Sequence, residues 1–144
     1  MADAAVIASR VEQIHGEYYG QAPAGVRVYE AGDVVVVLIE GTFTRAELTL
    51  IDRGEANEVQ AIRRRFEMTV ADQFMEVVQS ATGRRVRAFL SDTHLGEQLA
   101  VETFVLGEPV EDMTGFESVG SRADTEQQIS DQAERGDAFG RHEN

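Results

Sequence analysis

A short polar segment, residues 91–94, holds the side chains that most resemble a catalytic set. Ser91, Asp92 and His94 bring a hydroxyl, a carboxylate and an imidazole together, the three groups of the triad in nucleophilic hydrolases. A working triad needs a nucleophile bonded to a base that an acid orients, and close neighbours on one turn seldom meet that geometry. We therefore expect Asp92 to close an Asx-turn and His94 to lie in solvent, and we rank hydrolysis last among the functions considered.

The same segment could also supply metal ligands. Asp92, His94 and Glu97 offer the oxygen and imidazole donors that a hard or borderline metal accepts, but the helical pair of histidines that marks many metal sites is missing. The chain contains no cysteine, which removes disulfides, thiol nucleophiles, iron–sulfur clusters and thiolate zinc sites. We expect no cofactor, no metal and no enzymatic activity, and we keep Asp92, His94 and Glu102 as the candidate loop site.

Glu102 has two interpretations, which depend on the side of its predicted strand that faces the core. It shares one side with Phe104, while the other side is mainly valine. If the first side is interior, Glu102 is a buried carboxylate that needs a partner; otherwise it is solvated. We favour a cross-strand ion pair with Arg85 or Arg87, because structural pairs outnumber catalytic ones.

All 13 basic residues are arginine, and several gather around one predicted helix and the strand after it. Arginine binds anions in a bidentate manner, so these residues could form one anion-binding or partner-binding surface. The alternative for residues 63–65 is a solvated helix face with acids such as Glu67 nearby. The candidate contact residues are Arg63, Arg64, Arg84, Arg85 and Arg87.

Apolar spacing predicts the helices that would position these residues. Apolar residues three and four positions apart predict an amphipathic helix over residues 4–19, with His15 in a packing role beside its apolar stripe. A longer helix is expected over residues 55–82, in one piece or two, and Gly83 is suited to end it. At about 1.5 Å per residue this helix would be about 40 Å long and would outreach strands of about 25 Å. The apolar surface left over could form a homodimer.

Four β-branched runs predict the strands, at residues 26–29, 34–40, 84–91 and 99–106. The first run is joined to the second, and the third to the fourth, by a polar connection, so we expect two hairpins. Residues 34–39 are all aliphatic, which predicts that both faces of this strand are covered. The fold class is therefore α+β: two hairpins form a four-stranded, mainly antiparallel sheet, packed with an N-terminal helix and one long helix.

Charge and composition divide the chain near residue 106. Residues 1–106 carry 16 acidic and 10 basic side chains, whereas residues 107–144 carry 10 and 3 within a net charge of −13. We expect one domain over residues 1–106 and an acidic, disordered tail over residues 107–144. The acidic balance argues against nucleic-acid binding. Neither a signal peptide nor a membrane-spanning run is evident, so we expect no direct membrane insertion.

Several sequence blocks, taken in order, are similar to the MpsC family, a component of a bacterial sodium-translocating, membrane-potential-generating system. They include Glu-Tyr-Tyr-Gly-Gln-Ala-Pro at 17–23 and Gly-Thr-Phe-Thr-Arg-Ala-Glu at 41–47, with further blocks at 26–29, 34–38, 89–92 and 99–106. The resemblance covers about residues 4–106. It implies a non-enzymatic accessory or docking protein whose partners are membrane transport subunits, located in the cytoplasm or peripherally at the inner face of the membrane. The alternative function is a small-anion sensor that uses the arginines at 84–87.

Overall fold

The computed structural model describes residues 3–110, and its first helix begins and ends where capping residues predict. α1 (Ala4–Tyr19) follows Asp3, whose carboxylate accepts hydrogen bonds from the backbone N–H groups of Ala5 and Val6. It ends at Gly20, which takes a left-handed conformation with φ of 77°. The predicted N-terminal helix is confirmed.

The other two helices follow one another with a short break. α2 (Arg45–Asp52) starts with a capping box, in which Thr44 and Glu47 satisfy each other's backbone N–H groups. α3 (Ala56–Thr82) is one continuous helix of 27 residues that stops at Gly83. This answers the question that the sequence left open, because residues 56–82 form a single helix.

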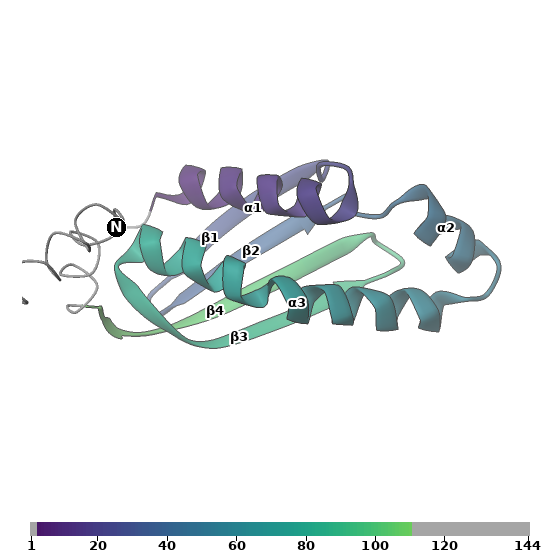
Figure 1. Cartoon of the computed structure of the whole chain (residues 1–144). Helices are drawn as coiled ribbons and strands as arrows, with labels where there is room; N and C mark the ends of the chain where they lie inside the picture. The colour runs from purple at the N-terminus through teal and green to yellow at the C-terminus, as the bar shows by residue number, and fades with distance from the viewer. Residues whose placement is uncertain (1–2, 111–144) are drawn as a thin grey trace, which may run out of the picture. The chain divides into compact units, whose positions relative to one another are not determined.

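Four antiparallel strands form the sheet in the order β1-β2-β4-β3 (Figure 1). They are β1 (Gly25–Ala31), β2 (Val34–Glu40), β3 (Arg84–His94) and β4 (Leu99–Pro109). The α+β fold with two hairpins is therefore confirmed. The second hairpin is longer than predicted, because its polar residues from Asp92 to His94 continue the ladder with Leu99–Val101. β4 likewise includes residues 107–109, which we assigned to the tail. Residues 111–144 of the predicted tail lie outside the described part.

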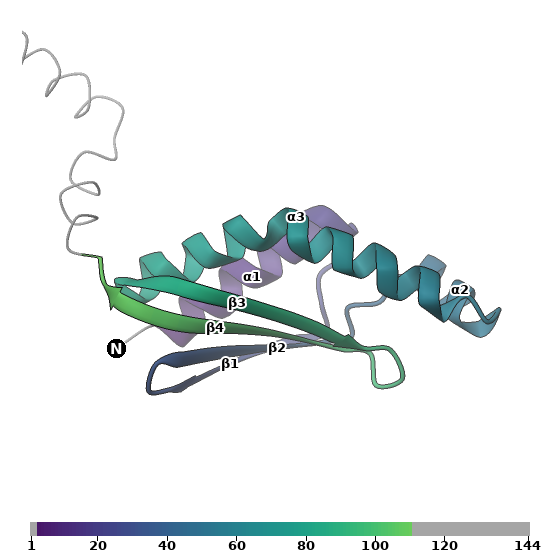
Figure 2. The same cartoon turned by 90° about the horizontal axis from the view of Figure 1, so that it is seen from below.

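The helices lie on one side of the sheet only (Figure 2). Along β2, Val35, Val37 and Ile39 are buried, whereas Val34, Val36 and Leu38 remain partly exposed. The expectation that both faces of this strand are covered is therefore wrong for residues 3–110. Uniform aliphatic composition predicted two covered faces, but the described helices pack against just one of them.

The core lies between this covered face and the two longer helices. Residues from α1, from the C-terminal half of α3 and from the sheet form one cluster, in which Ile7, Val78 and Phe104 are fully buried. Each such side chain contributes about 1.5–3 kcal/mol by leaving water. The remaining members include Val11, Ile14, Val35, Val37, Ile39, Val70, Phe74, Val77 and Leu106.

α2 and the first turns of α3 extend past the end of the sheet (Figures 1 and 2). Where α3 still lies over the end of β3, with Gln60 and Glu67 both bonded to Thr93, its apolar residues Ile62 and Phe66 are 42% and 37% exposed. Arg63 and Glu67 point inward in their place. The long helix thus reaches past the sheet at its N-terminal end, as predicted.

At Gly41, directly after β2, the backbone lies very close to Ala24. Its φ is 63°, and a Cβ at this position would lie 2.6 Å from the Cβ of Ala24. We expect Gly41→Ala to lower the free energy of unfolding by about 1–3 kcal/mol, since it adds a clash to a left-handed backbone. Urea denaturation measures this change. Gly25→Ala, where space is open, is the control and should change stability by less than about 0.5 kcal/mol; equal effects would contradict the account.

Candidate functional site

The largest group of buried polar side chains surrounds Arg63, which is only 1% exposed. Its Nε donates to Glu47 Oε2 at 2.6 Å, and its Nη2 donates to Glu47 Oε1 at 3.1 Å. Nη1 donates to the Thr42 hydroxyl and Nη2 to the Thr42 carbonyl, both at 2.8 Å. This bidentate arrangement fastens α3 to α2 and to the segment after β2.

Two aromatic rings, Phe43 beside Thr42 and Tyr19 of α1, complete the surroundings of Arg63. Its guanidinium carbon lies 3.9 Å from the centre of the Phe43 ring and 4.9 Å from that of Tyr19, distances that favour cation–π attraction. Tyr19 in turn stacks on His15 at 4.3 Å. Arg63 is thus a structural cation enclosed by the fold. From the sequence we proposed it as a contact for an external anion, but its guanidinium is not accessible to one.

A second set of buried polar groups lies next to this one, on the helix-covered face of the sheet. Glu67 accepts a hydrogen bond of 2.8 Å from the Thr93 hydroxyl. Glu102 is 2% exposed and pairs with Ser91 in the ladder. Among the described residues, Glu102 Oε2 and the Ser91 hydroxyl have no hydrogen-bond partner of good geometry. We call Arg63, Glu47, Thr42, His15, Tyr19, Glu67 and Glu102 the buried polar cluster.

Burial changes the protonation of this cluster. It raises the pKa of Glu102 to about 8, and the nearby Glu67 charge adds to the effect. Burial and the Arg63 charge lower the pKa of His15 to about 4, and burial raises the pKa of Tyr19 to about 12. Burial alone would raise the pKa of Glu47, but hydrogen bonds from Arg63 and Thr44 hold it below its usual value. At neutral pH the cluster therefore holds a proton on Glu102 and a neutral His15.

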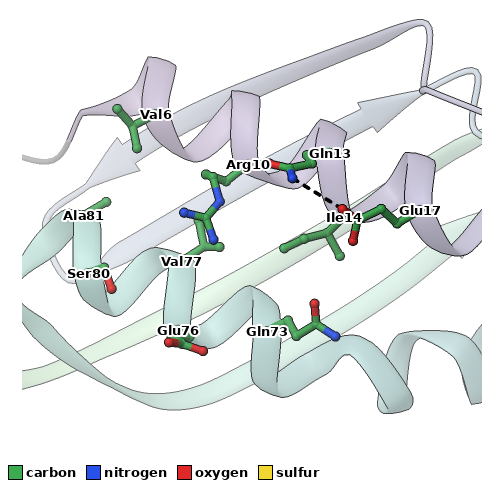
Figure 3. Close-up of a pocket in the computed structure, with 10 residues that line it drawn as sticks. All are labelled: Val6, Arg10, Gln13, Ile14, Glu17, Gln73, Glu76, Val77, Ser80 and Ala81. Atoms are coloured by element: carbon green, nitrogen blue, oxygen red, sulfur yellow. Dashed lines mark hydrogen bonds between the residues drawn. The ribbon is translucent and has the colours of Figure 1, made fainter. Parts of the chain in front are cut away.

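A cavity of about 10 Å³ adjoins the cluster, lined in part by His15, Glu67 and Glu102. That volume is at the lower limit for one water molecule, so the cavity has no room for an organic substrate. A larger surface groove of about 310 Å³ runs between α1 and α3 (Figure 3). Its polar lining is mostly exposed and of mixed charge, with Arg10, Glu17 and Glu76 among its residues. Neither hollow presents a convergent set of groups for catalysis.

The structure separates the residues of the predicted loop site. Side chains alternate along strands, and in this register Asp92 and His94 project from the uncovered face while Glu102 lies under the helices. His94 is exposed, as expected, and its Nδ1 accepts from the Glu97 N–H at 3.0 Å. The expected Asx-turn at Asp92 is wrong, because Asp92 belongs to β3. Within residues 3–110, no three histidine or acidic side chains are placed to hold a metal ion.

The arginines do not form the predicted common surface. Arg84 donates to Asp33 at 2.8 Å and to the Gly107 carbonyl at 2.9 Å, and Arg63 lies about 30 Å away along α3. The remaining candidates, Arg64, Arg85 and Arg87, are exposed. The expected ion pair of Glu102 with Arg85 or Arg87 is also wrong. Val86 between these two arginines faces the core, so their side chains project from the other side.

The role of Arg63 was missed although the sequence carried a signal for it. Positions 59, 63, 67, 70 and 74 have helical spacing, as do the apolar positions 59, 62, 66, 70 and 74. All five positions of the first set are buried. A core-facing side chosen from apolar residues alone leaves out Arg63 and Glu67, because charged residues are rarely buried unless paired. Their partners, Thr42, Glu47 and Thr93, come from distant segments, so the pairing was not visible.

The comparison with known families gives one match. The family model described as Na⁺-translocating membrane potential-generating system (MpsC) matches residues 4–108. No curated protein and no solved structure matches the chain. None of the helices within residues 3–110 has the length and apolar content required to cross a bilayer.

Arg63 and its exposed neighbour Arg64 form a matched pair for testing the cluster. Arg63→Ala leaves the Glu47 carboxylate and Thr42 without their partner, and we expect a loss of about 3–5 kcal/mol of unfolding free energy. Arg64→Ala should cost less than about 0.5 kcal/mol. Urea denaturation followed by circular dichroism measures both changes, and comparable losses would show that Arg63 is not the anchor.

Glu102 predicts a dependence of stability on pH. Its ordinary pKa is 4.5 and its folded value is about 8, so between these values the folded chain holds a proton that the unfolded chain has released. Rising pH therefore favours unfolding, an effect absent below about pH 4.5 and complete above about pH 8. Glu102→Gln should remove it, giving a stabilisation of about 1–3 kcal/mol at pH 8.5 that shrinks towards pH 5.

Thermal melts of the unmodified chain and of Glu102→Gln, recorded from about pH 5 to about pH 8.5, measure this difference in stability. Glu97→Gln, in the exposed connection between β3 and β4, serves as the control and should follow the profile of the unmodified chain. His15 works in the opposite sense below pH 6.5, since its folded pKa is lowered to about 4. A constant difference between Glu102→Gln and the unmodified chain at every pH would refute the role of Glu102.

Proposed function

The chain belongs to the MpsC family, and from this membership we propose that it is a non-enzymatic accessory protein that docks onto subunits of a Na⁺-translocating, membrane-potential-generating system. The family match carries the proposal, because it spans residues 4–108 and so includes the three helices and nearly all strand residues of the described part. In this proposal the protein works on the cytoplasmic side of the membrane. It acts by contact with its partners and carries out no chemical reaction.

The arrangement of polar groups supports contact over catalysis. The buried polar cluster is occupied with fastening α2 and α3 to the rest of the fold, through bonds of 2.6–3.1 Å. Within residues 3–110 the exposed histidine is His94, and it lies on a different face of the sheet from Glu102. The groups that could transfer protons are therefore either enclosed or separated.

Exposed apolar side chains on the N-terminal half of α3 supply a contact surface for a membrane subunit. Ile62 and Phe66 lie one turn apart on α3 and are 42% and 37% exposed, and the Phe66 ring contacts Tyr19. We call Ile62 and Phe66 the helix-end surface. Burying such side chains against a partner is favourable by about 25 cal/mol per Å².

Affinity capture from source-cell membranes tests this function. A tagged full-length chain, incubated with detergent-solubilised membranes, should recover a polytopic subunit of an ion-translocating complex. Ile62→Glu places a charge on the helix-end surface and should reduce recovery about tenfold or more. Met68→Glu, on an exposed position of the same helix, is the matched control and should recover as much as the unmodified chain. Recovery of no membrane subunit by the folded chain would contradict the proposal.

A further inference from the structure

The face of the sheet opposite the helices is aliphatic at its centre. We call it the open face; no described residue packs over it (Figure 2). Its central strands, β2 and β4, present side chains that are only partly exposed because they cover one another, and Leu90 of β3 beside them is 58% exposed. The aliphatic members are Val34, Val36, Leu38, Leu90, Val101 and Val105.

Such a composition is unusual for a solvated surface. An antiparallel sheet with one wet face normally alternates apolar residues inward with polar residues outward, whereas β2 is aliphatic on both sides from Val34 to Ile39. A contiguous apolar surface rimmed by polar residues marks an interaction site. Tyr29 of β1, which pairs with Val36 and is 51% exposed, extends this surface towards the sheet edge.

One row of the open face carries charges of opposite sign at its two ends, although Glu40 of β2 and Arg85 and Arg87 of β3 also project from this face. This row runs across the four strands from Arg27 through Leu38 and Val101 to Asp92. Arg27 lies on the outer strand β1, where it also forms an ion pair with Glu40, and Asp92 lies on the outer strand β3. The rim is therefore positive at one end of this row and negative at the other.

A second copy of the chain complements this pattern when it is turned about a two-fold axis parallel to the strands. The rotation places β1 over β3 of the second copy and β2 over β4, and it lays each row over the same row. Arg27 then faces Asp92 of the second copy, and symmetry repeats the contact at the other edge. An axis across the strands would place β1 over β1 and separate these charges.

We propose that the open face packs against the open face of a second copy, in an aligned sandwich with the aliphatic rows inside and Arg27–Asp92 contacts at both edges. Sheets that pack in this way lie about 10 Å apart with their strands within about 30°. Four strands about 4.8 Å apart and about 30 Å long present a plane of about 570 Å² per copy. This is near the lower limit of stable interfaces, about 600 Å² per partner, so the dimer should dissociate on dilution.

From the sequence we expected the homodimer to form through the apolar surface of the long helix. The proposed interface instead uses the open face of the sheet. It extends the proposed function, yet the two can fail separately. The helix-end surface lies on α3 and not on the open face, so a dimer leaves it free for a membrane subunit. A monomeric chain that still captures membrane subunits would overturn the interface alone, whereas a dimer that captures none would overturn the docking function alone.

Sedimentation velocity of the purified full-length chain over a wide concentration range provides the first test. The unmodified chain should approach twice its mass of 15.8 kDa as concentration rises. Leu90→Glu places a charge in the aliphatic rows and should give the mass of one chain, with an unchanged circular dichroism spectrum. Met68→Glu makes the same kind of change on the helix layer and should remain dimeric. An unmodified chain that stays monomeric, or a dimer lost in Met68→Glu but kept in Leu90→Glu, would overturn the proposal.

A charge exchange tests the orientation. Arg27→Asp and Asp92→Arg should each weaken the dimer about tenfold, since each places like charges opposite one another. The double variant restores opposite charges across the interface and should return the dissociation constant to within about threefold of the unmodified value. A double variant weaker than both single variants would refute this packing.

Discussion

The central strand β2 is aliphatic on both sides, and residues 3–110 provide helices for one of them. α1 and α3 together bury Val35, Val37 and Ile39 of β2, while the alternate residues of the same strand remain partly exposed. Because the side-chain period of a strand is two, this difference cannot be removed by a small movement of the helices. The uncovered aliphatic rows therefore define where another polypeptide can add the most stability.

The buried polar cluster has a different role, at the end of the sheet where α1, α3 and the segment leading to α2 meet. Apolar cover is thin there, and Arg63 substitutes for it by binding Glu47 and Thr42 with four hydrogen bonds. Enclosure has a cost, which is visible in the raised pKa of Glu102 and the lowered pKa of His15. The cluster fastens α2 and the N-terminal half of α3 to the rest of the fold, and in the proposed function this half of α3 presents Ile62 and Phe66 to a membrane partner.

Local patterns predicted the elements, the hairpins, the α+β class and the family, because caps, turns and apolar spacing depend on neighbours in sequence. The errors arose where the outcome depends on distant segments. Asp92 and Glu102 were grouped although the register of β3 with β4 puts them on opposite faces. Arg63 was placed in solvent because its partners lie 16 and 21 residues away. The side of β2 that lacks cover could not be inferred either, since its sequence is uniformly aliphatic.

The central claim, that a second polypeptide covers the open face, can be tested by the solvent accessibility of its methyl groups in the intact chain. Methyl relaxation by a water-soluble paramagnetic compound, measured by nuclear magnetic resonance, reports this for Val36, Leu38 and Val101 against exposed Met68. We expect the three open-face residues to be shielded at high protein concentration almost as fully as buried Val37. Relaxation of these methyl groups that matches their partial exposure in a single copy at every concentration would contradict the account.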